Sequence, residues 1–325
     1  MTEKMKTICV GRFLVDVPSQ AEVSLSREMM DGFDIDTVEE DEASFRKRVA
    51  AREAEITAQD GMVAARDLQV PGMIGRLFIH GRTRSYSMEG SRRVDDEWVS
   101  VGAYAHLDGV SFSLSMQYAD VPDGRTAEAL LARLRLRGET EIPSVPGFCI
   151  GRAIFTDPLP PHKTEHIAMH VGFRDHPDVA LALASLPGGG RDRSLLGRFA
   201  DMDTEASADE LLRVTKLRIG KRRINGINGE EVLERIREQN FASTYGFTWE
   251  TQGARGDLLH PFLSLELQGG ISPRPGGKPV ETSLHEDAVL ALWDRISSTI
   301  RPRPVTPTNY HPPLDMSIAG NPDHA

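Results

Sequence analysis

The sequence is poor in cysteine, in aromatic residues and in long apolar runs, and each shortage excludes a class of protein. Of 325 residues only two are cysteines, and 6% are aromatic. Two cysteines exclude a disulfide-dense scaffold and a cysteine-based zinc cluster. So few aromatic side chains cannot line an extended stacking platform for bases or sugars. The longest apolar run, about 179–186, is far below the roughly 18 residues that a membrane-spanning helix needs, which excludes an integral membrane protein.

Positive charge is also in short supply. The chain has 38 lysines and arginines against 48 aspartates and glutamates, which gives a net charge of −10. Such an acidic chain is a poor partner for the phosphate backbone of nucleic acid or for anionic lipid. With 39% hydrophobic residues, most of it is nevertheless expected to fold.

Self-comparison predicts two diverged copies of one domain. Residues 8–18 recur as residues 148–158, with Cys9 and Cys149 at equivalent positions. Further landmarks follow in the same order: 73–76 with 218–221, 110–117 with 260–268, and 127–136 with 286–300. We therefore expect an N-terminal repeat domain at 1–145 and a C-terminal repeat domain at 146–303, joined by a short proline-bearing turn at 142–147. A proline-rich tail, 304–325, is expected to be disordered.

Each copy shows the same coarse pattern of strands and helices. A first strand is predicted at 8–15 and 148–155, and a second near 21–30 and 163–173. The helix 41–58 places Phe45, Val49 and Ile56 near one face. Capping boxes are predicted at Ser207 and Glu210 and at Ser283 and Glu286, and hairpin turns at 79–81, 107–109, 225–226 and 254–257. Because strands come in runs and outnumber helices, the fold class is α+β, each copy an antiparallel sheet packed against helices.

Three histidines spaced four residues apart, His162, His166 and His170, are the strongest candidate for catalysis or metal binding. On a helix they would share a face and suit a metal ion. On a strand, four residues span about 13 Å, too far for one ion. Because the repeat predicts a strand, we interpret them as solvent-facing strand histidines and expect no metal, no cofactor and no catalytic residue.

Other motifs have structural interpretations. No Gly-x-Ser-x-Gly motif occurs, and Cys9 and Cys149 lie in apolar strands as small core residues, with a bridge between them neither required nor excluded. The glycines at 188–190 and 276–277 indicate loops rather than phosphate cradles. The acidic run 39–42 fits the first turn of a helix. The basic run 216–223 is an exposed strand face first and a protein contact patch second.

The two ends of the chain carry a family resemblance. Residues 7–18 and 283–304 resemble the immunity proteins that neutralise lipase effectors of bacterial type VI secretion systems, and residues 149–151 resemble the start of that family's C-terminal domain. The resemblance spans roughly residues 5–304. It implies a two-domain, non-catalytic protein that grips a cognate phospholipase in the periplasm and blocks its activation or its access to substrate.

The first residues contain no apolar segment or cleavage site, so we expect either a cytoplasmic chain or an export signal outside this sequence.

Two other functions remain open at this stage. One alternative function is a hydrolase or lipid-handling enzyme that uses His166 with Asp175 or Asp178. The other is an adaptor or chaperone for a secreted effector.

Overall fold

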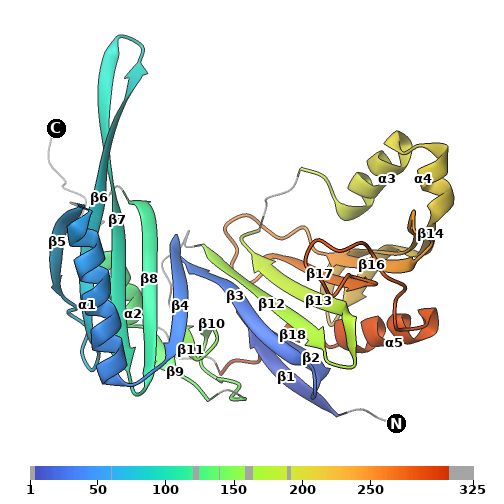
Figure 1. Ribbon diagram of the computed structural model, residues 1–325, viewed down its shortest axis with the longest axis horizontal. Coiled ribbons are helices and arrows are strands. Elements are labelled where there is room, and N and C mark those ends of the chain that lie inside the picture. The colour runs from blue at the N-terminus through green and yellow to red at the C-terminus, as the bar shows by residue number, and fades with distance from the viewer. Residues whose placement is uncertain are drawn as a thin grey trace, which may run out of the picture.

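Antiparallel strands dominate the fold of the computed structural model, which describes residues 4–59, 61–119, 124–138, 140–157, 164–188 and 192–306. Twelve strands form one sheet, and six others form two sheets of three strands. From edge to edge the large sheet consists of β14 (Val214–Ile224), β15 (Ile227–Arg237), β16 (Ser243–Glu250), β17 (Phe262–Gly269), β13 (His176–Leu186), β12 (Glu165–Phe173), β3 (Glu22–Met30), β4 (Phe33–Glu39), β8 (Val110–Ala119), β7 (Arg92–Leu107), β6 (Ile74–Glu89) and β5 (Met62–Asp67). The helices are α1 (Glu42–Ala58), α2 (Arg125–Leu131), α3 (Leu195–Glu205), α4 (Ala208–Arg213) and α5 (Glu286–Ser297) (Figure 1). The predicted α+β class with antiparallel sheets is confirmed.

The large sheet has the same order on both sides of its centre. Strands β3 and β12 pair in the middle. Outward from β3 the order is β4, β8, β7, β6 and β5, and outward from β12 it is β13, β17, β16, β15 and β14, so each strand has a counterpart in the other half. Along the chain, both halves also share one sequence of elements, four strands, a helical segment, four strands, a helix and a short strand. One predicted equivalence is wrong. Residues 73–76 lead into β6, whereas residues 218–221 lie on β14, which is the counterpart of β5.

The two small sheets join the halves by exchanging strands. The hairpin of β1 (Met5–Val10) and β2 (Phe13–Pro18) pairs with β18 (Arg301–Pro302), the last strand of the C-terminal half. The hairpin of β10 (Gly147–Cys149) and β11 (Ala153–Thr156) pairs with β9 (Leu134–Leu136), the last strand of the N-terminal half. Each half therefore completes the other, and they are not lobes connected only by residues 142–147.

Several local predictions are corrected by backbone geometry. Residues 8–15 and 148–155 each form a hairpin instead of one strand, because Gly11 turns the chain with φ +59° and the chain turns again at Gly151 and Arg152. The predicted turn at 79–81 lies inside β6, where Gly81, at φ +63°, accompanies a register shift, and the hairpin turns at Gly90 instead. Positive-φ glycine suits a bulge as well as a turn. The turn at 225–226 is confirmed.

The predicted helix ends are partly confirmed. Asp41 caps α1, since its side chain accepts a hydrogen bond from the Ser44 amide, and Ser207 and Glu210 form the capping box of α4. The second predicted box is wrong. The N-cap of α5 is His285, without a side-chain cap bond. Ser283 instead donates a 2.6 Å hydrogen bond from its hydroxyl to Asp178 of β13.

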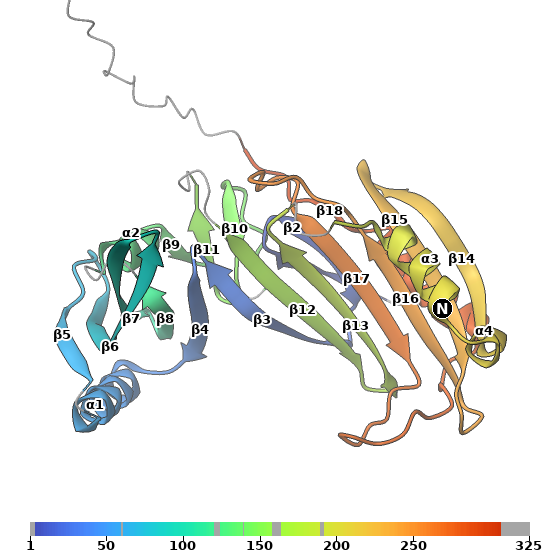
Figure 2. The same ribbon diagram turned by 90° about the horizontal axis from the view of Figure 1, so that it is seen from above.

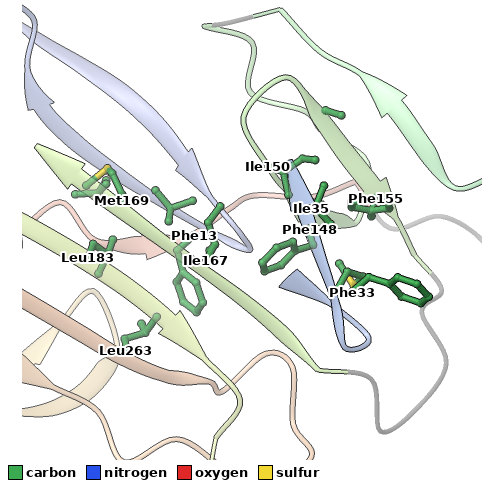
Figure 3. Close-up of a cluster of buried hydrophobic side chains, with 14 of the residues drawn as sticks. Phe13, Phe33, Ile35, Phe148, Ile150, Phe155, Ile167, Met169, Leu183 and Leu263 are labelled. Carbon is green, nitrogen blue, oxygen red and sulfur yellow. The ribbon is translucent and has the colours of Figure 1, made fainter. Parts of the chain in front are cut away.

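Apolar side chains from the small sheets pack against one face of the large sheet and form the core with it. Strands β3 and β4 pair only next to their turn, at Met29–Asp34 and Met30–Phe33, and then diverge (Figure 1). Phe148 and Phe155 of the β10–β11 hairpin are buried with Phe33 in the same hydrophobic cluster (Figure 3). Burial of such aromatic side chains, each contributing on the order of 2–3 kcal/mol, fixes how the halves are arranged.

Candidate functional site

The central strands of the large sheet leave one face open to solvent. On β12 and β3, Met169 and Leu25 lie opposite each other and belong to the core, so the residues next to them point to the other side. That other side carries mostly small or polar residues, which we call the open face: Ser24, Ser26, His170, Ala182, Ala184 and Glu266. Because Ser24, Ala182 and Ala184 are short, a partner protein can approach the strands closely beside His170 and Glu266.

Helices cover the same sheet only towards its two ends. At the N-terminal end α1 buries Phe45, whose ring stacks on His106 of β7 at a centroid distance of 5.3 Å. At the C-terminal end α3 packs on β15, and its Leu196 amide donates to Glu230 of that strand. Seen from above, α1 and α3 lie at opposite ends with the central strands between them (Figure 2). The open face, the uncovered floor of the sheet, therefore lies between the two ends that helices cover.

Charge on and beside this floor is mixed and weighted towards the acidic side. Asp34 and Asp36 of β4 are exposed and border the open face, on which Glu266 also is exposed. His170 exchanges a 2.9 Å hydrogen bond with the Ser26 hydroxyl. Burial, with a smaller contribution from Arg27, lowers the pKa of His166, so this histidine is neutral at physiological pH. A partner that docks here is expected to bring cationic or uncharged polar groups.

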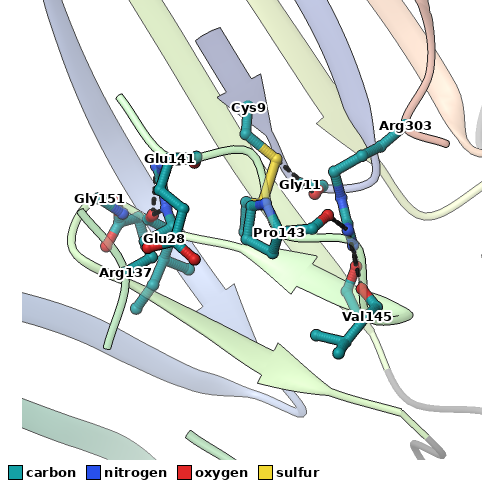
Figure 4. The surroundings of a disulfide bond; sticks show 12 residues. Cys9, Gly11, Glu28, Arg137, Glu141, Pro143, Val145, Gly151 and Arg303 are labelled. Atoms are coloured by element: carbon teal, nitrogen blue, oxygen red, sulfur yellow. Dashed lines mark hydrogen bonds between the residues drawn. A yellow bond between two sulfur atoms is a disulfide. The ribbon is translucent and has the colours of Figure 1, made fainter. Parts of the chain in front are cut away.

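A disulfide lies beneath the sheet where the two small hairpins meet. Cys9 of β1 and Cys149 of β10 are bonded, and the backbones of Gly11 and Cys149 exchange two hydrogen bonds beside it. Arg303 donates to the carbonyl oxygens of Val145 and Gly147 (Figure 4). The segment that joins the halves is thus held by a covalent bond and by a buried guanidinium. The sequence alone neither required nor excluded this bridge.

Comparison with known proteins identifies the family. Residues 6–140 match the model of the Tle cognate immunity protein 4 N-terminal domain, and residues 141–305 match that of its C-terminal domain. The chain belongs to the Tle cognate immunity protein 4 family. The predicted membership in a type VI immunity family is thereby confirmed. No curated protein matches the chain significantly.

Solved structures of similar proteins share this fold. The crystal structure of a Tle4–Tli4 complex contains a chain 26% identical to this one, with a TM-score of 0.74 over 93% of this chain and 98% of that one. The apo immunity protein TplEi of the Pseudomonas aeruginosa type VI secretion system gives the same values. A TplEi structure with an "L" peptide, 24% identical over 93% of this chain and 99% of that one, shows the same fold with a TM-score of 0.72.

Of the three histidines singled out in the sequence, the two that the structure describes do not converge on a site in this member of the Tle cognate immunity protein 4 family. His166 and His170 lie on β12, which confirms the strand interpretation, and His162 lies outside the described residues. Asp175 and Asp178 are at the far end of the β12–β13 hairpin from His166. Within the described ranges, no group of three or more potential ligands is placed to hold a metal ion.

The arrangement most like a catalytic triad has its members in the wrong order. His176 is 2.8 Å from the Ser283 hydroxyl, and that hydroxyl donates to Asp178. In a working triad the histidine stands between serine and carboxylate, so that it can take the serine proton. Here Asp178 also accepts from the Ser283 amide and the Thr282 hydroxyl. These bonds lower the pKa of Asp178 against the effect of its burial and fix the chain before α5.

The charged runs have structural partners. In the acidic run, Glu40 accepts from Arg48 and Asp41 caps α1, as expected for a helix start. In the basic run on β14, Arg218 forms two 2.8 Å hydrogen bonds with Asp294 of α5, and Arg222 pairs with buried Glu231. Lys221 and Arg223 remain exposed. Arg218 and Arg222 thus link β14 to α5, and Lys216 pairs with Glu234 of β15 and Asp203 of α3, contacts that the sequence spacing did not indicate. No helix of the described chain is long and apolar enough to span a membrane.

Proposed function

We propose that this protein is a non-catalytic immunity protein that binds and inhibits a cognate type VI phospholipase effector. The observation that carries the proposal is the family match over residues 6–140 and 141–305. The likeness to an immunity protein crystallised as a Tle4–Tli4 complex supports it. The scattered positions of His166, His170 and Asp178 support a binding role over hydrolysis.

We further propose that the effector is held against the open face, between the α1 and α3 ends of the molecule. A stable inhibitory complex buries roughly 1,600 Å² in total. The open face extends across the central strands β3, β12, β13 and β17, and its short side chains Ser24, Ala182 and Ala184 lose little conformational freedom on binding. The shared sheet and the exchanged strands β9 and β18 keep the two halves at a fixed spacing, so little conformational entropy is lost when the effector binds between them.

The periplasm is the proposed compartment. Disulfides persist in oxidising environments, including the bacterial periplasm, and are rare in the cytosol. The Cys9–Cys149 bond therefore supports a site of action outside the cytosol, where a phospholipase effector reaches membrane lipid.

Duplication of one ancestral domain is proposed as the origin of the chain, with limits at 1–145 and 146–303. Two observations support it, the matching order of elements and the symmetric order of the large sheet about β3 and β12. The equivalent pairings Cys9–Leu14 and Cys149–Ile154 agree with it. The tail expected at 304–325 lies outside the described residues from position 307 onward.

Titration of the effector tests the proposed function. The cognate lipase effector is assayed for ester hydrolysis while this chain is added. Complete inhibition at one equivalent is the expected result, since steric blockade requires a stable complex with nanomolar affinity. Residual turnover at saturation, or ester hydrolysis by this chain alone, would contradict the proposal.

A charged, bulky side chain on the floor tests the binding surface. Ala182→Arg projects from the middle of the open face, between His170 and Glu266, and should weaken effector binding by at least tenfold. Ala291→Arg is the matched control, because it is exposed on α5, whose Trp293 packs into the core on the opposite face of the sheet, and it should leave binding unchanged. Equal affinities for the two variants would place the effector elsewhere.

A further inference from the structure

Strands β6 and β7 continue beyond the sheet as a free two-stranded arm. Strand β8 accompanies β7 only as far as the Val99–Ala119 pair, and β5 accompanies β6 only as far as the Met62–His80 pair. From Thr83–Trp98 to Glu89–Arg92, β6 and β7 pair with each other and with no other strand of the described chain. At about 3.3 Å per residue this arm extends about 23 Å, and it projects alone in Figure 1.

One face of the arm carries large side chains that solvent surrounds. Tyr86 lies opposite Asp95 and Met88 opposite Arg93, so the two pairs share a face. Tyr86 is 63% exposed and Met88 58% exposed. The Arg93 guanidinium lies over the Tyr86 ring at 4.4 Å. The opposite face carries Ser85 and Ser87 together with Val94 and Trp98, which are only partly exposed.

Such a ribbon is costly for a protein that has no use for it. An isolated two-stranded hairpin is marginally stable in water, and exposed strands with apolar side chains invite aggregation. Ion pairs such as Arg84–Glu97 and Arg93–Asp95 help to hold the arm together. The counterpart hairpin, formed by strands β15 and β16 of only 11 and 8 residues, has no comparable extension. The arm is therefore an added feature of the N-terminal half.

We propose that the tip of the arm, formed by Tyr86, Met88 and Arg93, is an anchor that inserts into an apolar depression on the effector. This inference rests on the proposed function. Tyrosine and arginine lead among residues that dominate binding energy, and methionine adapts to irregular apolar pockets. A narrow convex arm fits a concave partner surface, while the open face meets the rest of the effector.

The charge of the arm favours a protein partner over a lipid surface. Between positions 82 and 97 the sequence has four arginines and four carboxylates: Arg82, Arg84, Arg92 and Arg93 against Glu89, Asp95, Asp96 and Glu97. The arm is therefore neutral. Anionic membranes attract segments with a cationic excess, which is missing here.

Binding of the purified effector to the full-length double variant Tyr86→Ala, Met88→Ala tests the anchor. Affinity should fall at least 30-fold, about 2 kcal/mol at 25 °C, mainly through faster dissociation. The matched control is Phe241→Ala in the β15–β16 turn. Phe241 is 75% exposed and has Arg237 near its ring, as Tyr86 has Arg93. This variant should bind like the natural chain, and both proteins should keep the natural melting temperature because the replaced side chains are exposed.

Each outcome separates the anchor from the proposed function. If the natural chain and the double variant bind the effector equally tightly, the anchor proposal is wrong and the immunity function still stands. Failure of the natural chain to bind would overturn the proposed function itself. Sedimentation of the natural chain, but not the double variant, with vesicles of phosphatidylethanolamine and phosphatidylglycerol would replace the protein partner with a membrane and overturn the anchor as stated.

Discussion

Loss of the Cys9–Cys149 bond should remove a large part of the protein's stability. The bond closes a loop with a sequence separation of 140 residues. In the chain-entropy description, restricting the unfolded chain by a loop of this length contributes about 5 kcal/mol, whereas 2–4 kcal/mol is more usual in practice. We therefore expect Cys9→Ala, Cys149→Ala to lower the free energy of unfolding by about 3–5 kcal/mol.

The measurement is guanidinium-induced unfolding, followed by tryptophan fluorescence, with and without reductant. Trp249 and Trp293 are fully buried in the C-terminal half and report on its unfolding. Reductant should move the midpoint of the natural chain to that of the double alanine variant and leave the variant unchanged. This comparison separates the covalent bond from the packing of the two side chains.

Two results would refute this reasoning. The first is a difference of less than about 1 kcal/mol between the oxidised natural chain and the variant. The second is a full count of free thiols in the purified natural chain. The second result would also remove the argument that links the disulfide to an oxidising compartment.

Two further predictions concern pH and backbone packing. Burial raises the pKa of Glu28 to about 6, although its hydrogen bond from the Gly151 amide and nearby Arg137 act in the opposite direction. Since the folded chain then holds this proton more tightly than the unfolded chain, stability present below about pH 4.3 is lost as pH rises through 6. Relative to Glu28→Gln, the natural chain should lose about 2 kcal/mol between pH 4 and 7, measured by urea unfolding; a constant difference would contradict the assignment. At Gly75, an added Cβ would lie 2.0 Å from the Tyr104 carbonyl oxygen, whereas nothing lies within 4 Å at Gly246. Gly75→Ala should therefore cost about 2 kcal/mol or more, and Gly246→Ala should be nearly neutral in the same assay; equal melting temperatures would show that β6 relaxes freely.

Local chemistry made part of the fold predictable. The helix at 41–58 was predictable because Asp41 satisfies free amides at its start while Phe45, Val49 and Ile56 recur on one face. The turn at 225–226 was predictable because Asn-Gly favours two successive positive φ angles. In each case the signal lies within a few residues and does not depend on the rest of the chain.

Features that depend on distant residues could not be predicted in the same way. Strands β9 and β18 are three and two residues long and pair with the other half of the chain, so no periodicity marks them. The arm was missed because its charged and small residues resemble a loop when burial is unknown. Ser283 has the spacing of a capping box, yet buried Asp178 offers its hydroxyl a charged acceptor from another strand. Charge-assisted hydrogen bonds are the stronger ones, and here that bond replaces the local cap.

The position of the disulfide follows from the symmetry that we propose for the two halves. In a two-fold arrangement, a residue can contact its own equivalent in the other copy only near the axis. Residues far from the axis contact residues that are not their equivalents. Cys9 and Cys149 occupy equivalent strand positions and are bonded, so an axis of this kind passes between them. Strands β3 and β12 pair antiparallel in the middle of the large sheet, which places them about the same axis. A bond at this axis constrains both halves equally. It therefore supports the pairing of the two small hairpins on which the arrangement of the halves depends.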